Sequence, residues 1–168
     1  STVTGTLGLQ AGGAIIQSGA LAVTGITTIT NAGNDVTLAT ATNDFMTDVL
    51  VTGVNVSIRD ANALDMGAST VTGTLGLQAG GAIIQSGALA VTGATTITNA
   101  GNNVTLTTAG NDFTGAVAVT GVNVALTDSN AIILGASTVT GTYAVTATTG
   151  NITQAVSTGL TVTGTSTF

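Results

Sequence analysis

Side chains able to do acid–base or metal chemistry are few in this chain, and nearly all are carboxylates. The chain has seven acidic residues, all Asp, a single base, and no His or Cys. Zinc, haem and iron–sulfur sites therefore lack their usual ligands, and Ser–His or Cys–His catalysis lacks its base. We expect no metal and no cofactor. The carboxylates are Asp35, Asp44, Asp48, Asp60, Asp65, Asp112 and Asp128.

The carboxylates of residues 35–65 suggest two further candidate functions, calcium binding and glycan hydrolysis. The segment 33–36 is similar to part of a Ca²⁺-binding nonapeptide, but that motif needs tandem copies and here it is isolated. Glycan cleavage needs an acid–base pair with shifted pKa values, usually beside basic or aromatic sugar-binding groups. With one Tyr, no Trp and one Arg, we expect no enzyme. We interpret the acids as turn residues, with Arg59 paired to Asp60 or to an acid of a neighbouring coil.

The overall charge excludes two classes of partner. A net charge of −6 with one base argues against nucleic-acid binding, which depends on neutralising phosphates, and against adhesion to anionic lipid. No stretch approaches the ~18–20 uninterrupted apolar residues of a spanning helix, so we expect no membrane insertion.

A long internal repeat organises the chain. The passage STVTGTLGLQAGGAIIQSGALAVTG, residues 1–25, returns unchanged at 69–93. Residues 1–68 align with 69–136 without a gap and differ at 15 positions, and a partial third copy occupies 137–168. Self-similarity at a fixed period indicates a repeat architecture. We expect one domain over 1–168, a fragment of a longer chain.

A shorter period is present within the long repeat. Val-Thr-Gly recurs in steps of 20, 28, 20, 20, 28, 20 and 23 along the sequence. Short segments alternate apolar and polar residues, as half-buried strands do, and Gly- and Asn-rich turns separate them. These features predict an all-β fold, a single right-handed parallel β-helix (β-solenoid) of about eight coils, each of roughly 20–28 residues. Three coils would make each copy of the long repeat, with like residues stacked on like between coils.

The longest of these steps predicts a loop that bulges from one corner of the coil. The segment ATATNDFMTDVL, residues 39–50, would carry about eight extra residues, and its counterpart is 107–118. Phe45 and Phe113 lie in these segments. Two interpretations stay open: each ring folds back to cap its loop, or the two rings form lateral contact loops for another rod or a surface.

The phrases GAIIQSGALAVTG, GNITQ, AGNDVTL and GASTVTG resemble the repeats of filamentous-haemagglutinin-like exoproteins, which are large secreted bacterial adhesins. The resemblance implies a right-handed parallel β-helix with three faces per coil. It also implies export across an outer membrane through a partner pore, and a role in adhesion or biofilm. The secretion domain of that family, with its Asn-Pro motifs, is missing, since this chain has no Pro.

We therefore expect a structural, non-enzymatic rod or stalk segment of an extracellular or cell-surface fibrous adhesin. A bare β-helix end exposes an open core and unpaired edges. Its partners would be neighbouring coils of the same chain or stacked copies of itself, and the sequence names no receptor. The alternatives are a protomer of a non-covalent filament that stacks end to end, and an ice-binding solenoid. The last rests on Thr-x-Thr segments such as Thr28-Ile29-Thr30.

Overall fold

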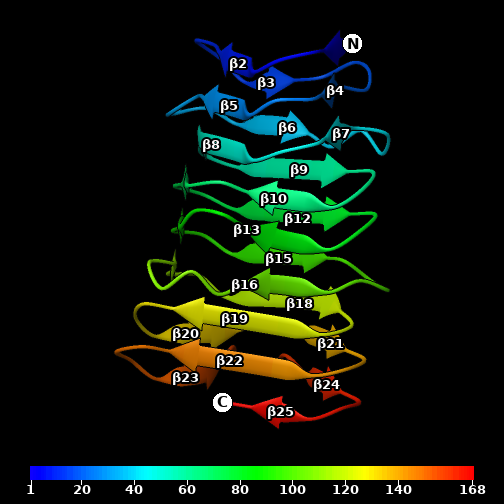
Figure 1. The fold of residues 1–168 in the computed structure, drawn as a ribbon. Coiled ribbons are helices and arrows are strands. Elements are labelled where there is room, and N and C mark those ends of the chain that lie inside the picture. The colour runs from blue at the N-terminus through cyan, green and yellow to red at the C-terminus, as the bar shows by residue number, and fades with distance from the viewer.

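Short parallel strands wind the chain into one continuous solenoid with no helix (Figure 1). The computed structural model describes residues 1–168. In Figure 1 the strands at the front run to the left and those behind run to the right as the chain descends from the N-terminus, which is a right-handed coil. The predicted all-β parallel β-helix of about eight coils is confirmed. The chain contains no helical segment that could cross a membrane.

All strands are short, between two and five residues. The strands are β1 (Thr2–Val3), β2 (Leu7–Gln10), β3 (Ile15–Ile16), β4 (Ala22–Val23), β5 (Thr27–Thr30), β6 (Val36–Leu38), β7 (Asp44–Phe45), β8 (Val49–Gly53), β9 (Val56–Asp60), β10 (Leu64–Met66), β11 (Ser69–Val71), β12 (Leu75–Ala79), β13 (Ile83–Gln85), β14 (Leu89–Val91), β15 (Thr95–Thr98), β16 (Val104–Leu106), β17 (Asp112–Phe113), β18 (Val117–Gly121), β19 (Val124–Asp128), β20 (Ile132–Leu134), β21 (Ser137–Val139), β22 (Tyr143–Ala147), β23 (Ile152–Gln154), β24 (Leu160–Val162) and β25 (Ser166–Thr167).

The strands stack into three sheets of three, twelve and ten strands, and every pairing is parallel. In the first coils β1, β2 and β3 each begin one side, and the next coil adds β4, β5 and β6 beneath them. The twelve-stranded sheet starts as β2, β5 and β8, and β8 then pairs with both β10 and β11. The longer strand β8 therefore stacks on two shorter strands, β10 and β11, in the next coil. The cross-section of the rod changes shape at this level.

The shortest and the longest coils both differ in length from the predicted limits of 20 and 28 residues. Val49 pairs with Met66 one coil further on, so the shortest coil has fewer residues than the shortest Val-Thr-Gly step. The longest step is not one long coil either, because Val23 pairs with Phe45 and not with Val51. Val51 belongs to the next side, where it pairs with Ile29. The predicted bulge of about eight extra residues is therefore wrong: within 39–50, Asp44–Phe45 continues the coil as β7 and Val49–Leu50 starts β8.

Each complete copy of the repeat makes three coils and one further strand. Copy 1 contains β1 to β10 and copy 2 contains β11 to β20, and each coil uses about three strands. Equivalent strands consequently lie in different stacks: β2 stacks on β5 and β8, β12 stacks with β3, β6 and β9, and β22 stacks with β10, β13, β16 and β19. Equivalent positions of successive copies therefore lie on different sides of the rod.

The core is a single apolar column along the axis. Buried Val, Leu and Ile side chains alternate with outward Thr, Ser and Gly, as the inside–outside pattern of β8, β9 and β12 shows. Thirty-one buried apolar residues, from Val23 to Val145, form one cluster. No gap separates copy 1 from copy 2, since Met66 at the end of copy 1 and Val71 at the start of copy 2 both belong to it.

In several Val-Thr-Gly triplets, such as 71–73 and 91–93, the glycine marks a corner where successive coils approach closely. A Cβ on Gly93 would lie 2.5 Å from the carbonyl oxygen of Gly73 in the coil above. Gly115 approaches Gly93 in the same way, and the Gly93 N–H donates to the Gly73 carbonyl at 2.9 Å. Glycine recurs here because any side chain would collide with the neighbouring backbone.

Candidate functional site

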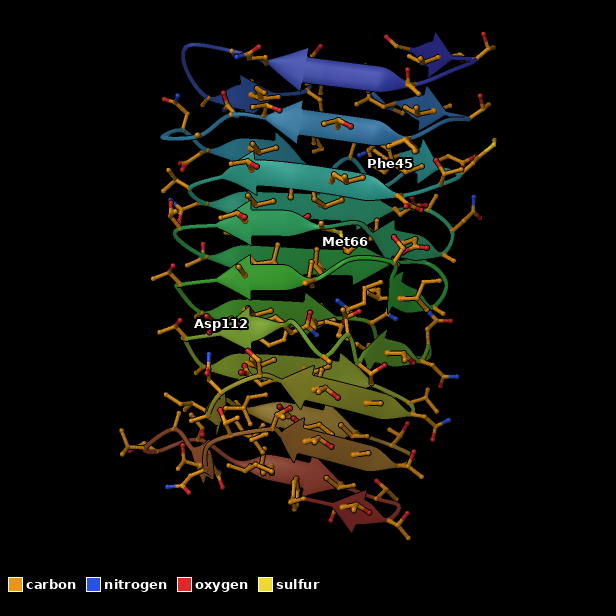
Figure 2. The ribbon with its side chains drawn as sticks, turned by 60° about the vertical axis from the view of Figure 1, so that its left-hand side comes forward. Phe45, Met66 and Asp112 are labelled. Atoms are coloured by element: carbon orange, nitrogen blue, oxygen red, sulfur yellow. The ribbon has the colours of Figure 1, made fainter.

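Phe45 and Phe113, the predicted lateral contact residues, do not lie on the surface. Phe45 is 2% exposed and Phe113 is fully buried, and Figure 2 shows Phe45 and Met66 between the strands of the solenoid. The interpretation of these rings as exposed contacts is therefore corrected: both belong to the core. They also occupy different sheets, since β7 is in the three-stranded sheet and β17 in the twelve-stranded one, so they form no row along the rod.

A pair of side-chain amides, a buried Asn and a half-buried Gln, holds the turn before each Phe. The Asn43 amide donates to Gln17 Oε1 at 2.9 Å, and Gln17 Nε2 donates back to Asn43 Oδ1 at 2.8 Å. Asn43 also donates to the Leu38 carbonyl and accepts the Leu21 N–H, each at 3.0 Å. One side chain thus satisfies backbone groups that the irregular turn leaves without strand partners.

Copy 2 repeats this pair with Gln85 and Asn111, whose two mutual hydrogen bonds are both 2.8 Å. Asn43 and Asn111 are fully buried. The sequence analysis did not identify these four residues. The signal was present, because both copies keep a Gln and an Asn at the same separation along the chain.

Two of the seven carboxylates are structural caps inside the coil. Asp60 Oδ2 accepts the Phe45 N–H at 2.8 Å, and its Oδ1 accepts the Asn62 N–H at 2.7 Å. Asp128 makes the same two bonds with Phe113 and Asn130. Burial raises the pKa of the Asp60 carboxyl above its ordinary value, whereas the two N–H donors act to lower it and the nearby Asp44 carboxylate acts to raise it.

Asp35 takes part in a polar ladder at one corner. Its Oδ1 accepts both the backbone N–H and the side-chain amide of Asn55, at 3.1 and 3.0 Å. In copy 2, Asn103 replaces Asp35 and accepts the same two bonds from Asn123. A neutral amide therefore does the work of this carboxylate, so the ladder does not require its charge. No group of three or more acidic side chains gathers as a metal site.

Asp48 and Asp65 lie on the outer side of the rod in adjacent coils. Val49 pairs with Met66, which places the residues before them, Asp48 and Asp65, one above the other. Burial raises the pKa of the Asp65 carboxyl, and repulsion from the Asp48 carboxylate adds to that shift, while Ser86 opposes it. Copy 2 has no such pair, because Ala116 and Ile133 occupy the equivalent positions.

Arg59 forms no ion pair, contrary to the expectation that it pairs with Asp60 or an acid of a neighbouring coil. The alternation of β9 explains this: Asp60 points into the core and is 1% exposed, whereas Arg59 is on the outer side. In the next coil Gln78, not an acid, pairs with Arg59.

The outward Thr residues do not form a regular array. Thr28 and Thr30 are exposed on β5. Their partners on one side are Gly8 and Gln10, and on the other side Leu50 follows Thr28. The flat Thr-x-Thr face that ice binding needs is therefore interrupted after one coil.

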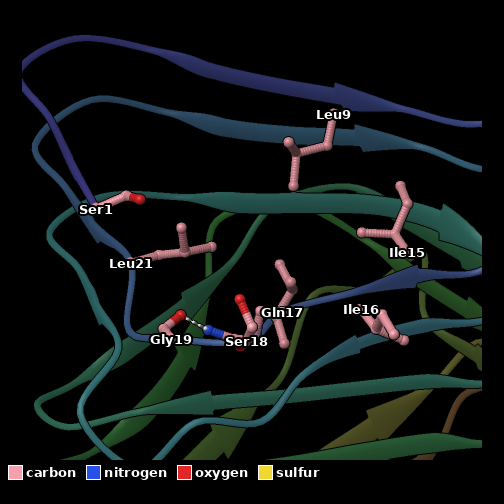
Figure 3. A pocket seen from close by; sticks show the side chains of 9 residues that line it. Ser1, Leu9, Ile15, Ile16, Gln17, Ser18, Gly19 and Leu21 are labelled. Carbon is pink, nitrogen blue, oxygen red and sulfur yellow. Dashed lines mark hydrogen bonds between the residues drawn. The ribbon is translucent and has the colours of Figure 1, made fainter.

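Both ends of the core open into apolar hollows. The hollow at the first coil has a volume of about 310 Å³, and Leu9, Ile15 and Leu21 project into it beside the Gln17–Gly19 hydrogen bond (Figure 3). The hollow at the last coil, about 240 Å³, is lined by Leu134, Ile152, Leu160 and Phe168 among others. No pocket collects acid, base and nucleophile side chains together.

Comparison with known proteins gives one family. A family model described as "Repeats of unknown function (DUF5649)" matches residues 1–52, 53–120 and 121–168. No curated protein and no solved structure matches the chain.

Proposed function

Because the chain belongs to this family of repeats, which cover it from end to end, we propose that it is a structural, non-enzymatic rod segment. Its role is mechanical: it holds other parts of a fibrous protein at a distance. We place that protein outside the cell or on a bacterial cell surface, as a fibrous adhesin, on the strength of the resemblance of its phrases to filamentous-haemagglutinin-like exoproteins. A role in cell–cell or biofilm adhesion would belong to the whole fibre.

This role is supported by the apolar core and the strand pairing, which both continue without interruption from copy 1 into copy 2. The apolar column passes from copy 1 into copy 2 without a gap, and β8 pairs with strands of both copies. Coils that contact mainly their neighbours can be added without disturbing the rest, so copying a repeat lengthens the rod. The sparse charge supports the same role, because stability then depends on apolar burial and backbone bonds and not on ion pairs.

Electron microscopy of the native material, with the mass of its denatured chain, tests the proposal. A thin rod carried by one very large chain is the expected result. Long fibres that dissociate into short chains would contradict it and would favour the alternative, a filament protomer that stacks end to end.

A further inference from the structure

Three positions on one corner of the rod carry large apolar side chains in copy 1 and small side chains in copy 2. Met46 is 59% exposed and Ile26 is 44% exposed, and Leu50 lies against Gly67 on the outer side. The equivalent residues of copy 2 are Thr114, Ala94 and Ala118. All three differences replace a large apolar side chain by a small one, although both versions fit the fold. The core therefore does not require the large side chains of copy 1.

These side chains lie beside the carboxylates of Asp48 and Asp65. The Thr27 N–H donates to the Asp48 carbonyl at 2.9 Å, which places Asp48 next to Ile26 in the coil above. Asp65 pairs with Ile84 in the coil below, and Ile84 is 41% exposed. Asp65 Oδ1 is buried and has no hydrogen-bond partner. We call the surface of Ile26, Met46, Asp48, Leu50, Asp65 and Ile84 the acidic corner.

The one basic side chain of the sequence lies on the opposite side at the same level. The acidic corner joins β7 of the three-stranded sheet to β8 of the twelve-stranded sheet, and Arg59 is on β9 of the ten-stranded sheet. In a three-sided rod, the corner between two sides faces away from the third. Arg59 belongs to the same coil as Asp48, and its partner Gln78 belongs to the coil of Asp65. The positive and negative groups therefore belong to the same coil, and their nearest partners to the next one.

A hollow lies on the same side of the rod as Arg59. It has a volume of about 150 Å³ and is lined by Ser57, Gly76, Gln78 and Thr96 among others. It exists because Gly76 has no side chain on the outer side of β12, where the nearest atom to an added Cβ is 3.8 Å away. The hollow spans β9, β12 and β15, the levels at which the acidic corner projects.

We propose that rods of this chain pack side by side, parallel and without axial offset. The acidic corner of one copy lies against the Arg59 side of a second copy. Arg59 of the second copy would meet Asp48 and Asp65 of the first, and Met46 or Leu50 of the first copy would enter the hollow of the second. Each rod has both surfaces on opposite sides, so the contact is heterologous and extends into a row of rods. Burial of the apolar side chains stabilises the contact, and the opposite charges determine the axial alignment of the two rods.

This contact goes beyond the proposed spacer role, which needs no lateral partner. It also differs from end-to-end stacking, which would cover the hollows at the first and last coils. The two are distinguished by shape: side-by-side packing widens the scattering particle, and end-to-end packing only lengthens it.

Sedimentation and small-angle scattering of the purified chain test the proposal. We expect the wild-type chain to form species heavier than the monomer as concentration rises, with a larger cross-sectional radius. Arg59→Asp should remain monomeric at the same concentrations, and the double reversal Arg59→Asp with Asp65→Arg should restore association. Gly76→Phe, which fills the hollow from the outside, should also prevent it.

Asp35→Asn is the matched control for charge. It removes one negative charge, as Asp48→Asn does, and Asn already serves at the equivalent position 103. Asp48→Asn should weaken association, whereas Asp35→Asn should not. A wild-type chain that stays monomeric, an Arg59→Asp variant that associates like the wild type, or growth in length alone would overturn the proposal.

Discussion

The Asp65 carboxyl combines partial burial with a like charge one coil away. Both effects raise its pKa above the ordinary value of 3.8. The folded chain then holds this proton more tightly than the unfolded chain does. Its contribution therefore favours folding at low pH, and that contribution is lost as pH rises from about 3.8 through the folded pKa.

Replacing Asp65 by Ile, the residue at position 133 of copy 2, should remove this dependence. We expect Asp65→Ile to be more stable than the wild type at pH 7, with the difference shrinking as pH falls towards 4. Urea unfolding at several pH values measures it. Equal differences at pH 7 and pH 4 would show that packing of the Ile side chain, and not charge, is responsible.

Glycine at the Val-Thr-Gly corner gives a second prediction for a single residue. Gly93→Ala would place a Cβ 2.5 Å from the Gly73 carbonyl oxygen, and the coils would have to separate there. We expect a loss of about 1–3 kcal/mol in the free energy of unfolding, measured by denaturant titration.

Gly76→Ala is the control for this substitution. Its added Cβ would have no neighbour closer than 3.8 Å, so its effect should stay within about 0.5 kcal/mol. A loss as large as that of Gly93→Ala would point to a general requirement for glycine in these strands and not to the close approach of two backbones.

At the scale of elements, the turn between β16 and β17 depends on one amide. Asn111 donates to the carbonyls of Leu106 and Thr127 and accepts the Leu89 N–H, at 3.2, 3.1 and 2.9 Å. Together with its two bonds to Gln85, these contacts join three successive coils. The amide thus replaces strand pairing where the chain departs from the ladder.

Asn111→Ala should therefore destabilise the fold by about 1–3 kcal/mol, because buried backbone groups lose their partners. Thermal and urea unfolding measure the loss. Asn102→Ala is the comparison, since that amide makes one exposed hydrogen bond, to the Gly80 carbonyl at 3.3 Å. Similar losses in the two variants would contradict a special role for this amide pair.

At the scale of the whole molecule, ten strands per copy rotate each copy by one side relative to the last. Three such copies would complete ten coils, a superperiod of ~48 Å at ~4.8 Å per coil. A surface feature found once per copy would therefore wind around a long rod. The pair of Asp48 and Asp65, which copy 2 lacks, shows that the copies also differ in the side chains on their surface.

Spin labels test this rotation, since the chain has no Cys of its own. Ile26 and Ile84 lie on one column three coils apart, so cysteines at these positions should carry labels ~14 Å apart along the axis. Ile26 and Ala94 are equivalent in sequence but belong to different sides. We expect a clearly longer distance for the second pair. Equal distances would mean that each copy makes three whole coils.

Most of the fold could be predicted from the sequence, but the side of the rod on which each segment lies could not. Alternation of Val, Leu and Ile with Thr and Gly determined the strands, and the repeat of Val-Thr-Gly determined the coiling, because both are local or self-similar patterns. The assignment of the longest Val-Thr-Gly step to a bulging loop failed. Spacing alone does not tell whether Val51 stacks on Val23 or lies one side further on.

The sequence by itself therefore determined a parallel solenoid of about eight coils with a weakly charged surface. Only the tertiary structure decided where each residue lies around the axis. It placed Phe45 in the core and Met46 on the surface, and it set Arg59 opposite Asp48 and Asp65. The physical reason is that the partners of a coil are the coils above and below, so each side chain's place depends on stacking register, which no single segment contains.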